Sequence, residues 1–186
     1  SRKLVVEQGG LEAVESLLIA RFMMFSTVYF HHAVRIATLM VQNALLDAIK
    51  AGEVGKPELL LLGDEEMLSK LCTVPDSKAL AQSVRDRRLY KRAYEAAISD
   101  VGKIPAKLQE KLSEETGCKV LVDIPYKFWR TPEISILSEG ELSRIGKASL
   151  LVKSLSEAQH SRLRLIVACE QKDVPKVASA AKKILG

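Results

Sequence analysis

The sequence predicts a mostly α-helical fold that ends in a small α+β part, and three observations predict it. Residues 11–51 contain neither glycine nor proline and place apolar residues at helical spacing. Further helical segments follow up to residue 116, bounded by glycine or proline. After Gly117 the pattern changes to short runs rich in β-branched residues, which are typical of strands. We therefore expect a helical part over residues 1–116 and a small α+β domain over residues 117–186, with a short, mainly antiparallel sheet.

The first helical stretch is expected to run from Leu11 to about Ala51, as one long helix or as two helices with a bend near Ser26-Thr27. Gly52 ends it, because glycine is favoured just after the last helical turn. The apolar face is wide, which indicates a central core helix rather than a surface one. Its stripe consists of Leu18, Phe22, Phe25, Tyr29, Ile36, Met40 and Leu45.

Shorter helices are expected after a loop at residues 52–57. One ends near Leu62, and Asp64 is the expected N-cap of the next. Pro75 begins a helix that is expected to continue to about Ser99. Another covers residues 105–116 and ends at Gly117.

The last third of the chain mixes strands with helices. Residues 119–124, 133–137 and 161–168 have the composition of strands, and residues 147–159 have a helical pattern. A closing amphipathic helix is expected over residues 173–185, with Asp173 as its N-cap and Pro175 in its first turn.

Charge is distributed unevenly along the chain. Residues 1–118 carry 16 basic and 16 acidic side chains, whereas residues 119–186 carry 12 basic and 7 acidic ones, which produces the net charge of +5. A positive field favours anionic ligands, including nucleotides and nucleic acid. A solvated surface explains the same excess, so both interpretations stay open.

The cysteine pattern and the apolar segments indicate a cytoplasmic protein. Cys72, Cys118 and Cys169 have no spacing typical of a zinc knuckle or a redox pair, and they are expected to be thiols in a reducing compartment. No signal peptide is recognised, and charged residues interrupt the apolar stretch from Leu11 to Leu46, so no membrane association is expected. The start without methionine is expected for part of a longer protein, although processing or trimming gives the same start.

Three side chains of the first helix stand four residues apart. Arg21, Phe25 and Tyr29 are expected on one helix face, with His32 on the next turn. A guanidinium offers a planar fork to phosphate oxygens, and a tyrosine ring can lie against a sugar or a base. The alternative is an apolar core helix in which Arg21 forms a buried ion pair, with Glu15 or Asp47. Periodicity alone favours this alternative, because aromatic stripes usually belong to a core.

The segment Ala20–His32, which reads ARFMMFSTVYFHH, resembles HD-domain dNTP triphosphohydrolases. That family has an arginine followed eight residues later by tyrosine and then by x-His. The resemblance implies that Arg21 contacts the substrate triphosphate and that Tyr29 packs beside the nucleoside. His31 matches the family histidine near the nucleotide-bearing interfaces, and His32 completes the expected substrate-binding set. Phe25 stands where relatives often have histidine, and His32 where they often have lysine, which leaves the nucleotide and any effector site open.

A second segment, Arg85–Glu95, reads RDRRLYKRAYE and resembles the R-x-L-Y-K element of the same family. In effector-gated relatives the arginine and lysine of this element touch an activating nucleotide, which implies an effector or phosphate-binding role for Arg87 and Lys91. The alternative is a solvated basic face whose residues pair with Asp86 and Glu95. On the expected helix the basic residues form two stripes, one of Arg85, Arg88 and Arg92 and one of Arg87 and Lys91.

The resemblance covers residues 10–100 and implies a helical bundle associated with an HD domain. The family holds a divalent metal (Mg, Mn, Fe, Ni or Co) in an H…HD…D pattern, and the metal activates water for attack on a phosphoester. The three histidines here are His31, His32 and His160, and no His-Asp dipeptide occurs. Neighbouring histidines diverge by about 100° on a helix. We therefore expect the metal-binding region upstream, and a chain that has no catalytic residue or metal of its own and is inactive alone.

The expected partners are a nucleotide substrate, the upstream HD region and, by resemblance, further copies of the chain. A non-catalytic module that binds nucleic acid through the Arg85–Arg92 segment and the basic C-terminal part is the first alternative. A structural or oligomerisation lobe is the second. No glycine-rich phosphate loop or nucleophile elbow accompanies these residues, so no other catalytic class is favoured.

Overall fold

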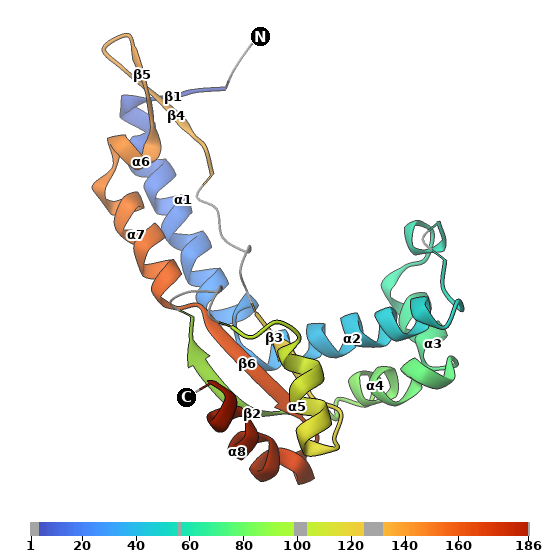
Figure 1. The fold of residues 1–186 in the computed structure, drawn as a ribbon. Helices are drawn as coiled ribbons and strands as arrows, with labels where there is room; N and C mark the ends of the chain where they lie inside the picture. Colours follow the sequence, from blue (N-terminus) through green and yellow to red (C-terminus); the bar gives the residue numbers. More distant parts are fainter. Residues whose placement is uncertain (1–3, 56, 99–103, 125–131, 186) are drawn as a thin grey trace. The chain divides into compact units, whose positions relative to one another are not determined.

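The computed structural model describes residues 4–55, 57–98, 104–124 and 132–185. They form a mostly helical fold with two three-stranded sheets, in which antiparallel pairing predominates, and this confirms the predicted fold class (Figure 1). The chain divides into two compact units. The first contains residues 1–30, 97–99 and 125–164, and the second contains residues 31–96, 100–124 and 165–186. Each unit takes segments from both sides of residues 116 and 117, where the sequence analysis places a domain boundary.

The first unit combines helices with a sheet of order β1-β4-β5. β1 pairs parallel to β4, and β4 pairs antiparallel to β5 through a tight turn in which Glu139 and Gly140 both have positive φ. Figure 1 shows α7 running alongside α1, and the two helices are in contact. In chain order the elements are β1 (Val6–Glu7), η1 (Gln8–Gly10), α1 (Leu11–Met24), η2 (Phe25–Tyr29), β4 (Ser135–Ser138), β5 (Glu141–Arg144), α6 (Ile145–Ala148) and α7 (Leu150–Ser161).

One side of α1 forms the core of the first unit. Leu18 is buried together with Ile136 of β4, Ile145 of α6 and Val152 of α7. Partly buried Leu11 and Val14 of α1 pack against this cluster. The burial of apolar surface on this side of the helix holds α1 to the sheet and to α7.

The second unit is built around α2 and a sheet of order β2-β6-β3, in which β3 is antiparallel to β6. Residues 165–169 of the central strand β6 are all buried. Figure 1 shows α5 close to α8 and β3, and each of these pairs is in contact. Its elements are α2 (His32–Lys50), η3 (Glu58–Leu60), α3 (Asp64–Leu71), α4 (Pro75–Arg85), β2 (Lys91–Ala97), α5 (Leu108–Thr116), β3 (Leu121–Asp123), β6 (Arg164–Cys169), η5 (Gln171–Asp173) and α8 (Val174–Leu185).

A buried ion pair joins α2 to β3 in the second unit. The Nε atom of Arg35 lies 2.7 Å from Oδ2 of Asp123, and Arg35 is only 9% exposed. Met40, Ala44 and Ala48 continue the same helix and are completely buried. The pair therefore fixes the first turns of α2 to the sheet, while apolar packing holds the rest of the helix.

Several sequence predictions are confirmed. The first stretch forms two helices, α1 and α2, with the break beginning at η2, close to Ser26-Thr27. Helices α5 and α8 occur as expected, and Gly117 ends α5 with a φ of 64°. Strand β3 falls within the run expected over residues 119–124, and β4 and β6 each extend one residue past the end of their expected runs.

Other predictions are wrong. The helix from Pro75 ends at Arg85 instead of reaching Ser99, because Arg87 has a φ of 57° and residues 91–97 join the sheet as β2. Gly63, not Asp64, is the N-cap of α3, and the Glu66 carboxylate accepts a hydrogen bond of 3.0 Å from the Gly63 N–H. Strand β5 was not anticipated.

Among the described residues, no single helix is long and apolar enough to cross a membrane. Within the same described ranges, one bent pair, Gln8–Tyr29 with His32–Lys50, passes such a test when its two helices are taken together, on length and composition alone.

Asp123→Ala is expected to lower the free energy of unfolding by about 3 kcal/mol, because it removes the carboxylate that lies 2.7 Å from the buried Arg35 guanidinium. The matched control is Glu133→Ala, which removes an exposed pair with Arg144 at 3.6 Å. That control should cost less than about 1 kcal/mol. Urea unfolding measures both, and equal losses would contradict the role assigned to the buried pair.

Alkaline pH is expected to destabilise the second unit. Burial, reinforced by nearby carboxylates, raises the pKa of Tyr90 to about 12 and the pKa of Cys169 to about 11. The unfolded chain loses these protons near the ordinary values of 10.0 and 9.0, so the unfolded state binds fewer protons over this range. Stability that is fully present below about pH 9 should therefore fall as the pH rises toward about 12. Tyr90→Phe should flatten the upper part of this decline in urea unfolding, and an unchanged slope would contradict the assignment.

Candidate functional site

A cation and two aromatic rings form a row at the end of α1, in the first unit. The guanidinium carbon of Arg21 lies 5.2 Å from the centroid of the Phe25 ring. The Phe25 centroid in turn lies 4.9 Å from that of Tyr29. The three side chains that the sequence places four residues apart therefore touch one another in order. We call Arg21, Phe25 and Tyr29 the cation–aromatic row.

The row faces solvent instead of a closed core. Arg21 is exposed, Phe25 is half-buried and Tyr29 is 53% exposed. The buried arginine of this stretch is Arg35, which pairs with Asp123. The interpretation of Arg21 as a buried core residue is therefore wrong, and the phenol ring has open space beside it.

The row extends from α1 into a wide, π-helical turn at η2, which carries Phe25 and Tyr29. The Phe30 N–H donates to the Phe25 carbonyl at 2.8 Å, which is a hydrogen bond across five residues. The Thr27 hydroxyl donates to the Met23 carbonyl at 2.8 Å on the same turn. Such turns occur frequently at functional sites. Sequence reasoning predicted a bend here but not its π-helical form, because no residue type signals this geometry.

His31 and His32 begin the second unit. The Nδ1 atom of His31 accepts the Ala33 N–H at 3.4 Å, which makes His31 the N-cap of α2. The two imidazole rings lie 4.4 Å apart. The pKa of His32 lies below its usual range because of partial burial first and of the positive charges of Arg92 and His31 second, while Glu95 opposes the shift. Partial burial and the two neighbouring positive charges thus favour the neutral imidazole of His32.

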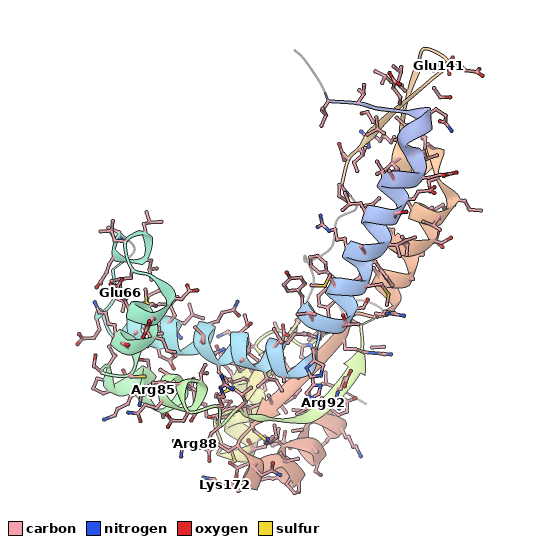
Figure 2. The ribbon with its side chains drawn as sticks, turned by 180° about the vertical axis from the view of Figure 1, so that it is seen from behind. Glu66, Arg85, Arg88, Arg92, Glu141 and Lys172 are labelled. Carbon is pink, nitrogen blue, oxygen red and sulfur yellow. The ribbon has the colours of Figure 1, made fainter. Side chains whose placement is uncertain are left out.

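The basic segment Arg85–Arg92 of the second unit is not helical throughout. In Figure 2, Arg85 lies at the end of α4, Arg92 on β2 and Arg88 between them. The expected helical stripes are therefore wrong, because the helix ends before most of the basic residues. The ion pairs of the segment join Asp86 to Arg85 at 3.5 Å and to Arg88 at 2.7 Å, and Glu95 to Arg92.

Arg87 and Lys91 differ from their basic neighbours. Both are exposed, and within the described ranges neither has an ion pair. The alternative, in which the basic residues pair with Asp86 and Glu95, therefore holds for Arg85, Arg88 and Arg92. It does not hold for Arg87 and Lys91. The two residues singled out by the resemblance are the ones whose charge no described carboxylate neutralises.

In the part of the chain that the structure describes, no group of three or more histidine, cysteine, aspartate or glutamate side chains is arranged so that it could hold a metal ion. The described residues therefore do not fit the divalent metal that the resemblance implies. A shallow pocket of about 310 Å³ in the second unit is lined by Asp47, Lys50, Asp76 and Lys119. Asp47 pairs with Lys119 at 2.7 Å, and the four charges balance, which does not favour a polyanion there.

Comparisons with known proteins agree with this fold. A family model described as HD associated region matches residues 1–186. An uncharacterized protein of Methanocaldococcus jannaschii is 27% identical over 170 residues, which are 84% of this chain and 37% of that protein. A solved structure of a hypothetical protein from Aquifex aeolicus matches with a TM-score of 0.68 and 24% identity, over 95% of this chain and 47% of that one. A phosphohydrolase from Bacteroides thetaiotaomicron matches with a TM-score of 0.56 and 19% identity, over 91% and 52% of the two chains.

The two solved structures establish the fold alone at these identities. The chain spans between 37% and 52% of the lengths of the proteins it matches. Those proteins therefore contain at least about as much polypeptide again outside the matched part.

Arg92→Gln is expected to raise the pKa of His32, because it removes a positive charge that lowers this pKa and keeps the Glu95 carboxylate that raises it. NMR titration of the imidazole signals measures the change, with His31→Gln to assign them. Arg88→Gln is the matched control, since Arg88 pairs with Asp86 and is not among the charges that shift His32. A lower or unchanged pKa in Arg92→Gln would contradict the described environment.

Proposed function

The chain belongs to the HD associated region family, and from this membership we propose that it is the substrate-binding part of an HD-domain nucleotide phosphohydrolase similar to dNTP triphosphohydrolases. The observation that carries the proposal is the exposed cation–aromatic row at the end of α1. In the proposal Arg21 binds phosphate oxygens and Tyr29 packs beside the nucleoside.

The chemistry of the row suits a phosphorylated nucleoside. A guanidinium donates parallel hydrogen bonds to two phosphate oxygens, and it keeps its charge at any physiological pH. The contact with Phe25 orients the Arg21 side chain through a cation–π interaction before a ligand arrives. The half-exposed Tyr29 ring offers an aromatic face and a hydroxyl to a base or a sugar. A charged end and an aromatic end in one row match the two ends of a nucleotide.

Hydrolysis itself belongs, in the proposal, to the region of the longer protein that lies outside this chain. The matched proteins have room for such a region, since the chain covers about half of their lengths or less. A divalent metal held there would supply activated water for attack on the phosphoester. The chain described here contributes binding and orientation of the substrate.

Arg87 and Lys91 are proposed as a separate phosphate-binding or effector contact within the second unit. Their support is the absence of a carboxylate partner in the described ranges, next to three basic residues that have one. A nucleic-acid-binding module is the second candidate, because the same two charges would meet a phosphate backbone. The neutralisation of Arg85, Arg88 and Arg92 weakens that candidate.

In the longer protein, Arg21→Gln is expected to lower kcat/KM for dNTP hydrolysis by between about 10-fold and about 150-fold, the loss expected for one hydrogen bond to a charged group. The thermal unfolding temperature should hardly change, because Arg21 is exposed. Arg162→Gln is the matched control, since its exposed guanidinium likewise lies over a ring, 5.0 Å from the Phe22 centroid.

Equal hydrolysis by the wild type and Arg21→Gln would contradict the proposal, as would equal losses in both arginine variants. Salt-sensitive RNA or DNA binding that is lost in Arg87→Gln, together with unchanged hydrolysis in Arg21→Gln, would favour the nucleic-acid-binding module instead.

A further inference from the structure

Helix α1 has a second apolar side that nothing in the described chain covers. Its core side is formed by Leu11, Val14, Leu18 and Phe22. A second set of apolar residues is spaced at intervals of four, three and four residues. Because each residue turns the helix by about 100°, this set lies on another side of α1. We call this set, which consists of Ala13, Leu17, Ala20 and Met24, the outer stripe.

The outer stripe is open to solvent. Leu17 is 65% exposed and Met24 48% exposed, and both alanines are exposed. Helices on a protein surface normally place polar residues on the side that meets water. The charged residues of α1 are Glu12, Glu15 and Arg21, and none of them belongs to the stripe. A helix that is apolar on both sides is typical of an element buried on both sides.

The spacing of the stripe indicates what kind of element covers it. When two helices pack along each other, their contact residues recur at alternating intervals of three and four residues. The outer stripe has the same spacing. Small and large residues alternate, since Ala13 and Ala20 stand on either side of Leu17. A neighbouring helix could therefore place its own side chains over the alanines and receive Leu17 and Met24 between its turns.

We propose that the outer stripe docks a helix of the HD region in the longer protein, and the identity of that region rests on the function proposed above. The matched proteins carry at least about as much polypeptide again outside the matched part, within the same molecule. A covalently attached partner has a high effective concentration, so a stripe of four residues suffices to position it. A free second copy would need a buried area of about 1,200 Å² or more.

The docked helix would also complete the candidate site. Arg21 stands four residues after Leu17 and therefore lies one turn farther along the helix, next to the stripe. A partner that covers Leu17 and Met24 borders the cation–aromatic row and supplies a wall beside it. The stripe would thus position the HD region against the residues that bind substrate.

Cysteine labelling tests the proposal with two matched variants, Leu17→Cys and Leu142→Cys. The two leucines have nearly equal exposure, 65% and 64%, and both belong to the first unit, but Leu142 lies on β5. Each variant is made in the longer protein and in the 186-residue chain, and a maleimide reagent is followed by peptide mass spectrometry. Peptide analysis separates the new thiol from Cys72, Cys118 and Cys169.

In the longer protein, Leu17→Cys is expected to react at least about 10-fold more slowly than Leu142→Cys, because the stripe opens only when the partner helix leaves. In the 186-residue chain the two variants should react at similar rates. Equal rates in the longer protein would overturn the proposal. Protection that already appears in the 186-residue chain and grows with its concentration would assign the stripe to a second copy, and would overturn it as well.

The labelling readout is independent of hydrolysis. Protection of Leu17→Cys together with full activity of Arg21→Gln would leave the docking surface standing and remove the proposed substrate role. Loss of activity in Arg21→Gln without protection of Leu17→Cys would support the proposed substrate role and remove the docking surface.

Discussion

The wide helical turn at η2 is the constraint that leads from α1 toward α2, and it carries two of the three residues of the candidate site. Its hydrogen bond between the Phe30 N–H and the Phe25 carbonyl ends α1 while the Phe25 ring stays in contact with both Arg21 and Tyr29. The next residue, His31, caps α2 with its side chain. A few consecutive residues therefore end one helix, begin the next and carry two of the three side chains of the exposed row.

Arginines with the same formal charge have different roles here because their surroundings differ. Arg35 is buried and joins α2 to β3 through Asp123, so its charge serves the fold. Arg21 is exposed over an aromatic ring, where a ligand can reach it from solvent. Arg88 is neutralised by Asp86, whereas Arg87 has no ion pair among the described residues. Burial and local carboxylates thus separate structural cations from candidate binding cations, which a net charge of +5 could not do.

Sequence patterns predicted the elements whose ends are determined by neighbouring residues. They failed where residues distant in the sequence determine the structure. The spacing of Arg21, Phe25 and Tyr29 was enough to predict the row, and Gly117 was enough to end α5. The segment 91–97, KRAYEAA, has high helix propensity yet forms β2, because the central strand β6 provides a neighbour for it. Asp123, which pairs with Arg35, is 88 residues away in the sequence, so no helical or strand periodicity could indicate the pair. The interleaving of the two units along the chain is equally invisible in chain order.

In the proposed function, the end of α1 binds a phosphorylated compound and also contacts the rest of a longer protein. The most direct measurement is a crystal structure of that longer protein with a non-hydrolysable dNTP analogue. We expect phosphate oxygens within hydrogen-bonding distance of the Arg21 guanidinium, the nucleoside beside Tyr29, and a helix of the HD region over Leu17 and Met24. An analogue bound away from Arg21, with Leu17 still facing solvent, would contradict it.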